Sequence, residues 1–396
     1  MSKSKDAPLA DAGELETPQN AEPVGLIRRR SFLATGLAVG AGASLGPLGR
    51  TVAAFADTGG QPTLGDIAIL RFLAAAEILE TDLWQQYNEL GGIQDSEVPG
   101  GSGSAPYIKA LETLDEDMPQ YIHDNTDDEH SHFHFINAYL ESKGAEPVNL
   151  DKFRELPSSK ATGAQQIGRL TNLMELSVDT SFWTRYRSST KNPDLGDEFA
   201  PAVPGLLKGK FPAIPRSDSD LAPQPHLQAI ANTAGFHFAF IEQGGSSLYP
   251  TLARKVTNLQ VLRILLSIGP SETMHFQTWQ DKAGNALPLT DVDNGPGGTG
   301  ATVTFTDLSK AQGETNPDSL NGDTLQANLI MPEPCDFIDP ALGPVAIVRP
   351  TSTNLNGAVA AVLGLVNDGL FIGQPQQFVD ILFDLAHEAD IARREF

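Results

Sequence analysis

The chain has 396 residues, of which 40% are hydrophobic and 7% aromatic. That composition is enough to bury a core, so the chain is not disordered as a whole. Its formal net charge of −23 argues against binding to nucleic acid or to anionic lipid. The one cysteine, Cys335, excludes an intrachain disulfide and any cysteine-based metal or redox cluster.

The N-terminus has the layout of an export signal. Arginines occupy positions 28–30, small and apolar residues dominate positions 34–48, and Ala54 and Ala56 form a small-x-small cleavage site. The apolar run is too short and too rich in glycine to make a good membrane span. We therefore expect residues 1–56 to be a leader that is removed, and the mature chain not to be an integral membrane protein.

The basic part of this leader resembles a twin-arginine signal, through Arg29-Arg30-x-Phe32-Leu33. The resemblance implies export of a folded protein, often with its metals already bound, to the periplasm or the extracellular space. Without disulfides, the exported chain must take its stability from packing, to which a bound metal would add.

Four long segments of the mature chain have apolar residues at helical spacing. The first two are expected at about 63–90 and 119–143, and the last two at about 225–253 and 258–282. The link between the third and the fourth is short, whereas a long insertion, 144–224, separates the second from the third. This pattern predicts a mainly helical fold built on a four-helix bundle.

The rest of the mature chain is expected to be richer in loops. The insertion is predicted to contain one helix, at about 164–190, followed by proline-rich loop. The bundle domain covers residues 57–290, and residues 291–396 form a loop-rich C-terminal extension. Two short β runs and two closing helices are expected in this extension, at 302–306, 345–348, 358–370 and 376–394.

Two Glu-x-x-His pairs, Glu129 with His132 and Glu272 with His275, fall on the second and fourth segments. A spacing of three puts both side chains of a pair on one helix face, where they can bind one ion. Steps of three and four from either pair reach largely apolar residues, so both pairs are expected to be buried. A buried carboxylate is costly unless it is paired or bound to a cation. The core of the bundle therefore needs a positive partner.

Two Asp-x-x-His pairs have the same spacing but different surroundings. The steps from Asp127 and His130 reach mostly polar residues, which indicates a solvated face. Asp384 and His387, on the last predicted helix, are likewise expected to be solvated. We do not expect either of these pairs to belong to the metal site.

The first and third segments supply further carboxylates. Glu242 is the only acidic residue of the third segment and lies in the middle of its apolar face, and Glu77 and Glu80 share an apolar face of the first. A helix rises about 1.5 Å per residue, so in antiparallel hairpins these carboxylates and both Glu-x-x-His pairs fall at similar depth. The sequence thus predicts a two-metal carboxylate site. The alternative is a metal-free network in which Glu and His share protons.

The order Glu, Glu-x-x-His, Glu, Glu-x-x-His, with a long second connection, resembles the ferritin-like superfamily. Residues 70–80, Leu-Arg-Phe-Leu-Ala-Ala-Ala-Glu-Ile-Leu-Glu, are similar to the opening helix of exported members that include desiccation-related proteins. Residues 240–244, Phe-Ile-Glu-Gln-Gly, are similar to their third-helix motif. The resemblance covers about 64–142 and 226–285.

The resemblance implies a ferritin-like bundle that binds two metal ions. In the family a small residue follows the first-helix ligand by one turn, as Thr81 follows Glu77, which favours Glu77 as a ligand and Glu80 as a bridging or supporting residue. The implied metal residues are Glu77, Glu80, Glu129, His132, Glu242, Glu272 and His275.

Carboxylate and imidazole ligands at open positions suit iron or manganese. The expected chemistry is therefore redox, either oxidation of ferrous iron or disposal of a small oxidant such as peroxide or oxygen. Two alternatives stay open: a structural stress or desiccation protein with a vestigial or purely structural site, and a di-iron oxygenase with a substrate cavity. The sequence names no catalytic residue, and it leaves the oligomeric state open, a homo-oligomer included.

Overall fold

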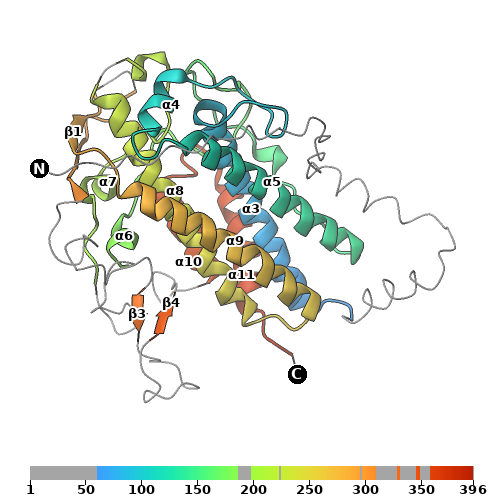
Figure 1. Ribbon diagram of the computed structural model, residues 1–396. Coiled ribbons are helices and arrows are strands. Elements are labelled where there is room, and N and C mark those ends of the chain that lie inside the picture. The colour runs from blue at the N-terminus through green and yellow to red at the C-terminus, as the bar shows by residue number, and fades with distance from the viewer. Residues whose placement is uncertain are drawn as a thin grey trace, which may run out of the picture. The chain divides into compact units, whose positions relative to one another are not determined.

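The four long helices expected from the sequence are present in the computed structural model (Figure 1). They are α3 (Leu64–Gly91), α5 (Met118–Ser142), α8 (His226–Ala253) and α9 (Leu259–Ala283). The structure describes residues 60–185, 198–222, 224–294, 297–308, 328–330, 345–347 and 357–395. The predicted leader, residues 1–56, and Cys335 lie outside these ranges.

Local capping explains where α3 and α9 begin. The side chain of Thr63 accepts a hydrogen bond from the backbone N–H of Asp66, and the Asp66 carboxylate accepts one from the backbone N–H of Thr63, which makes a capping box. The side chain of Asn258 caps the first turn of α9. Asp66 also accepts from the N–H groups of Thr257 and Asn258, so the start of α3 is joined to the turn between α8 and α9.

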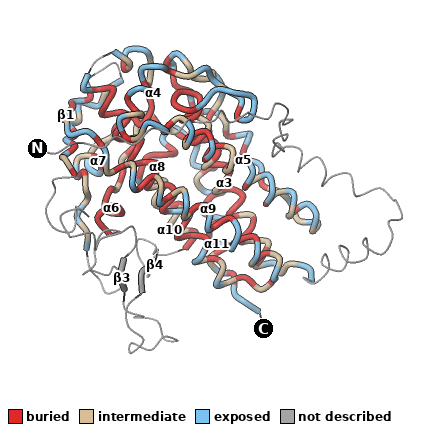
Figure 2. The backbone as a smooth tube through the Cα atoms, viewed as in Figure 1, coloured by how far each residue is buried: buried red, intermediate tan, exposed pale blue. Residues whose placement is uncertain are grey.

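The bundle consists of two helix pairs. α3 packs against α5, and α8 packs against α9, as the short and long connections predict. α5 also lies beside α9 (Figure 1), where Tyr139 Oη donates a hydrogen bond to Gln260 Oε1 at 3.1 Å. Figure 2 shows that buried residues follow the facing sides of these helices, so one core runs between them.

The insertion between α5 and α8 differs from the prediction. Where it is described, the stretch expected to be a helix at about 164–190 is helical only in α6 (Ser181–Arg185). The reason lies in α3, where the Asp82 carboxylate accepts hydrogen bonds from the backbone N–H groups of Leu170 and Thr171 at 3.0 and 2.9 Å. A helix would use these N–H groups for its own carbonyls. The predicted helix was wrong because a buried partner on another helix outweighs local propensity.

Shorter elements occupy the connections of the bundle. They are α4 (Ala105–Leu111), the 3₁₀ helix η2 (Asp151–Phe153), α7 (Pro204–Lys208) and the 3₁₀ helix η4 (Asp218–Asp220). A buried ion pair at 2.6 Å, between Arg169 and Glu89, joins the insertion to α3 a second time.

The C-terminal extension contains the two predicted β runs and the two predicted helices, and each β run pairs with a strand that we did not expect. β2 pairs antiparallel with β1, and β4 pairs antiparallel with β3. The elements are β1 (Leu289–Val292), β2 (Thr302–Phe305), β3 (Asn328–Ile330), β4 (Val345–Ile347), α10 (Ala358–Asp368) and α11 (Gln376–Ile391). α11 packs along α3, so the end of the chain joins the bundle in space. Among the described residues, every helix is too short or too polar to span a bilayer.

Candidate metal centre

The two Glu-x-x-His pairs face each other between α5 and α9. His132 Nδ1 lies 3.0 Å from Oε2 of Glu129 in its own pair and 3.2 Å from Oε1 of Glu272 in the other. Glu77 on α3 places its Oε2 at 3.3 Å from the same nitrogen. One imidazole nitrogen therefore faces carboxylates from three helices.

The second imidazole has a similar environment. His275 Nδ1 lies 3.2 Å from Glu129 Oε1 and 3.3 Å from Oε2 of Glu242 on α8. The two oxygens of Glu129 are thus directed at different imidazoles, as in a carboxylate placed between two ions.

The donor atoms fall into two overlapping groups, and within each group they lie no more than 4.8 Å from one another. The groups are Glu77, Glu129, His132 and Glu272, and Glu129, Glu242, Glu272 and His275. Glu129 and Glu272 belong to both groups, whereas each of the other residues belongs to one. Two shared carboxylates and one separate Glu-His set on each side are compatible with a pair of metal ions.

Protein donors orient the two unshared carboxylates. Glu77 Oε1 accepts a hydrogen bond from the hydroxyl of Tyr249. Glu242 Oε1 accepts from Trp84 Nε1 at 3.0 Å and from Asn125 Nδ2 at 2.9 Å. Each carboxylate therefore uses one oxygen for these donors and keeps the other toward an imidazole.

Asn125 connects the cluster to an aromatic layer. Its amide nitrogen also donates to Glu129 Oε1 at 3.1 Å, and its amide oxygen accepts from Trp279 Nε1 at 2.7 Å. The rings of Trp279 and Trp84 stack with their centroids 5.2 Å apart. These two buried rings cover the Glu242 side of the cluster with apolar surface, which strengthens electrostatic interactions there.

The cluster has more acidic than basic groups, and burial makes the surplus costly. Burial raises the pKa of Glu77 to about 7, against the lowering effect of His132. Burial and then the charge of Glu129 raise the pKa of Glu272 well above its ordinary value. Burial alone would also raise the pKa of Glu129, but the imidazoles of His132 and His275 lower it below its ordinary range. A metal-free cluster must therefore take up protons where bound cations would neutralise the same carboxylates.

Several buried oxygen and nitrogen atoms that could bind a metal ion lack a hydrogen-bond partner among the described residues. They are Glu77 Oε2, Glu80 Oε1, Glu242 Oε2, both carboxylate oxygens of Glu272, and His275 Nδ1. Each unsatisfied buried polar atom costs about 1–3 kcal/mol. A cation would supply the missing partner, and oxygen and imidazole donors suit iron or manganese. The residues present therefore fit the metal ions that the sequence predicts.

Glu80 is the one predicted metal residue that belongs to neither group. Its side chain is partly buried, and burial, followed by the charges of Glu129 and Glu242, raises its pKa well above the ordinary value. Glu80 is therefore close to the cluster, while Glu77 is the first-helix residue within it. The role of all seven residues as ligands stays a prediction.

The two Asp-x-x-His pairs lie outside the two groups. Asp384 and His387 are exposed, whereas Asp127 and His130 are half-buried and belong to neither group. His237 is buried on α8 and hydrogen-bonded through Nδ1 to the hydroxyl of Tyr87 at 2.7 Å, away from the two groups.

Sequence reasoning did not single out the residues that orient the cluster. Trp84, Asn125 and Tyr249 lie on the apolar faces that carry the carboxylates, and a polar atom on such a face is the signal that could have identified them. Asp128 and Ser271 contact the imidazoles from outside. Each immediately precedes the glutamate of a Glu-x-x-His pair. The sequence does not show that this position contacts the imidazole of the opposite pair, because that contact depends on the packing of α5 against α9.

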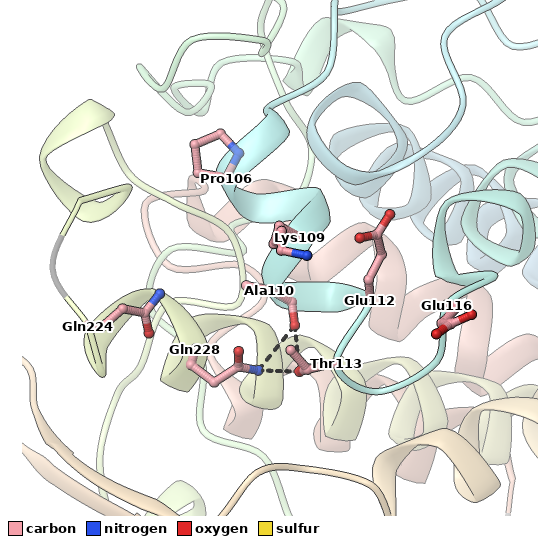
Figure 3. A pocket seen from close by; sticks show the side chains of 8 residues that line it. All are labelled: Pro106, Lys109, Ala110, Glu112, Thr113, Glu116, Gln224 and Gln228. Carbon is pink, nitrogen blue, oxygen red and sulfur yellow. Dashed lines mark hydrogen bonds between the residues drawn. The ribbon is translucent and has the colours of Figure 1, made fainter.

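A hollow of about 520 Å³ lies elsewhere, between α4 and the start of α8 (Figure 3). Its lining includes Gln228, whose amide donates to Thr113 Oγ1 at 2.7 Å and to the Ala110 carbonyl at 3.1 Å. The other lining residues are Pro106, Lys109, Glu112, Glu116 and Gln224. None of them belongs to the carboxylate–histidine cluster, so we assign this hollow no part in its chemistry.

Comparison with models of protein families finds a match. A family model described as a ferritin-like domain matches residues 65–284, which is more than half of the chain and contains nearly all of α3, α5, α8 and α9. No curated protein and no solved structure matches the chain.

Proposed function

Because the chain belongs to the ferritin-like domain family, we propose that its bundle binds two metal ions, iron or manganese, at the buried carboxylate–histidine cluster. The observation that carries this proposal is the overlap of two donor groups through Glu129 and Glu272. In this assignment Glu77 and His132 serve one ion, and Glu242 and His275 serve the other.

The chemistry that such a bound pair supplies is electron exchange with ferrous iron, oxygen or peroxide. The protein's own contribution is to position the ligands and to manage protons. Tyr249 and Trp84 hold the unshared carboxylates in place. Burial, and then the charges of Glu129 and Glu242, raise the pKa of Glu80 well above its ordinary value, so its carboxyl group can give or take a proton beside the cluster.

One other function has an observation in its favour, namely a structural stress protein with a metal-free cluster. His132 Nδ1 lies at hydrogen-bond distance from Glu129, and such a contact can share a proton without any ion. The surplus of buried carboxylates argues against this alternative, because the Nδ1 proton of each imidazole satisfies only one of the carboxylate oxygens around it and leaves the others without a donor. The hollow in Figure 3 gives an oxygenase no support, since no cluster residue lines it.

We also propose that the protein is exported by the twin-arginine route and works in the periplasm or outside the cell. The support is the arginine pair, the apolar run and the small-x-small site of residues 28–56. Export after folding would allow the ions to be bound before the chain leaves the cytoplasm.

Elemental analysis of the protein purified after export by its native host tests the metal proposal. We expect about two equivalents of iron or manganese per chain, and consumption of ferrous iron or peroxide by the loaded protein. Protein without metal, whose melting temperature does not change when either ion is added, would instead favour the structural alternative.

A further inference from the structure

The two imidazoles of the cluster are oriented in the same way. Each turns Nδ1 toward the carboxylates and Nε2 toward the residue that precedes the glutamate of the opposite pair. His132 Nε2 lies 3.2 Å from Ser271 Oγ on α9, and His275 Nε2 lies 3.2 Å from Asp128 Oδ2 on α5. The site therefore has two corresponding halves, one completed by a hydroxyl and the other by a carboxylate.

Both outer contacts select the same imidazole tautomer. Ser271 Oγ donates its proton to the carbonyl of Ile268 at 2.7 Å, so it accepts from the Nε2–H of His132. The ionised carboxylate of Asp128 can only accept, so it also requires the proton of His275 to be on Nε2. With one ring proton held on Nε2, each Nδ1 can exchange the proton that it shares with the carboxylates for an ion.

The outer contacts differ in strength. A hydrogen bond to an ionised acceptor is about twice as strong as one between neutral groups. A carboxylate behind a ligating imidazole also raises the basicity of that ligand, and loss of such a partner typically costs 10–100-fold in metal affinity. The side chain of Asp128 is 40% exposed, and its Oδ2 lies 3.2 Å from Nε2 of His275.

We propose that Asp128 and Ser271 are positioning residues that make the two ion positions unequal. The position of His275 and Glu242 binds its ion more tightly and fills first, and the position of His132 and Glu77 fills second and releases its ion faster. This inference rests on the proposed function, because it requires two bound ions.

Titration of the metal-free protein with Co²⁺ alone, followed by calorimetry and visible absorption, tests the proposal. Two binding steps are expected for the unchanged chain. Glu242→Gln should weaken the tighter step and Glu77→Gln the weaker one, because each glutamate belongs to only one donor group. These two variants identify the steps.

Asp128→Asn should weaken the tighter step by about 10–100-fold and leave the other step within about threefold. Ser271→Ala should weaken only the second step, by less than Asp128→Asn weakens the first. Asp128→Glu should restore part of the loss, which a purely structural role would not predict. Asp127→Asn is the matched control, since it removes a charge one residue earlier on α5, outside both groups, and should change neither step.

The exchange variant Asp128→Ser/Ser271→Asp gives a test that does not depend on loss of binding. In it, Glu77→Gln should affect the tighter step and Glu242→Gln the weaker one. Two Co²⁺ ions bound with equal affinity, or an Asp128→Asn variant with both steps unchanged, would overturn this inference and leave the proposed function standing. A folded, unchanged chain that binds no Co²⁺ would contradict the proposed function itself, and the inference with it.

Discussion

Gly245 on α8 faces the carboxylate of Glu272 on α9 so closely that a Cβ atom at position 245 would lie inside contact distance of Glu272 Oε2. The glycine lies one turn after Glu242 on a long continuous helix, where glycine costs about 1 kcal/mol relative to alanine. The helix has glycine at this position despite the cost, because any side chain here would displace Glu272, which both donor groups of the candidate metal centre share.

Gly245→Ala should therefore weaken metal binding while it leaves the metal-free fold within about 1 kcal/mol of the original stability, since the end of a glutamate side chain can shift. The measurements are metal affinity and urea unfolding of the metal-free protein. Gly244→Ala is the matched control, because nothing lies within 4 Å of a Cβ atom at that position. It should stabilise the helix by up to about 1 kcal/mol and keep the affinity. Equal affinities for the two variants would contradict this role of Gly245.

The carboxylates of the cluster should differ from those outside it. Glu242→Gln and Glu272→Gln keep the side-chain shape and remove the charge. Metal affinity should fall by at least about 10-fold, because the loss of a residue that only hydrogen-bonds to a ligand already costs that much. Glu242→Gln should weaken one ion and Glu272→Gln both, since only Glu272 is shared.

Without metal, the same two variants should be as stable as the original chain or more so, because a buried carboxylate has been replaced by a neutral amide. Asp127→Asn should change neither property. Metal content and melting temperature, measured for the three variants, test whether Glu242 and Glu272 are ligands and Asp127 is not. A loss of metal in Asp127→Asn as large as that in Glu242→Gln would remove the basis for the ligand assignment.

The stability that the carboxylates of the cluster give the metal-free protein should fall as pH rises from about 5 to 7. The pKa of Glu77 is raised from 4.5 to about 7, so the stability linked to its protonation is fully present below 4.5 and is lost as pH approaches 7. The pKa values of Glu80, Glu242 and Glu272 are raised as well, chiefly by burial, so they act in the same direction. The Glu77 effect alone amounts to as much as about 3 kcal/mol.

The metal-loaded protein should not show this fall, because bound ions replace the protons and their affinity increases as the ligands deprotonate. Melting temperatures of both forms across this pH range measure the effect, and the difference between them should widen with pH. A difference between the two melting temperatures that does not widen from pH 5 to 7 would count against a surplus of buried carboxylates.

His226 should stabilise the start of α8 in a pH-dependent way. Its Nδ1 lies 2.7 Å from Asp291 on β1 and its Nε2 lies 3.3 Å from Asp220, which also pairs with Arg216. The hydrogen bond to Asp220 is the main reason that its pKa is raised to about 9. The stability that His226 adds is therefore complete below 6.5 and is lost as pH rises through 9.

His226→Gln should destabilise the protein by up to about 3 kcal/mol at pH 6 and by much less above pH 9. Chemical unfolding at the two pH values measures this change. His387→Gln, at an exposed position on α11, is the control and should have almost no effect at either pH. A loss of stability in His226→Gln that is the same at both pH values would show that its charge is not involved.

Replacement of both Arg29 and Arg30 by lysine should block export, because the twin-arginine resemblance depends on this pair. Fractionation of cells that express the variant measures the effect, and cleavage near Ala56 is expected only in the exported form. Undiminished export of the double variant would exclude the twin-arginine route, although not export by another one.

Much of the architecture could be predicted because it depends on local periodicity. The apolar spacing places the long helices to within one or two residues, and in the structure Thr63 and Asn258 cap the starts of α3 and α9. The same spacing separates Glu129 and His132 on a buried face from Asp127 on another, since residues three and four apart share a helix face wherever the helix lies. The depth of the carboxylates follows from helix length, and the structure brings them together.

What the tertiary structure decided is how residues distant in the chain meet. The insertion has no helix at 164–180, because Asp82 on α3 occupies its backbone N–H groups, and no local pattern shows that partner. The sharing of Glu129 and Glu272 between two donor groups, and the exclusion of Glu80 from both, depend on the rotation of each helix about its own axis. Packing fixes that rotation. The contact between Asp128 on α5 and His275 on α9 likewise depends on how these two helices pack, so the sequence alone does not show it.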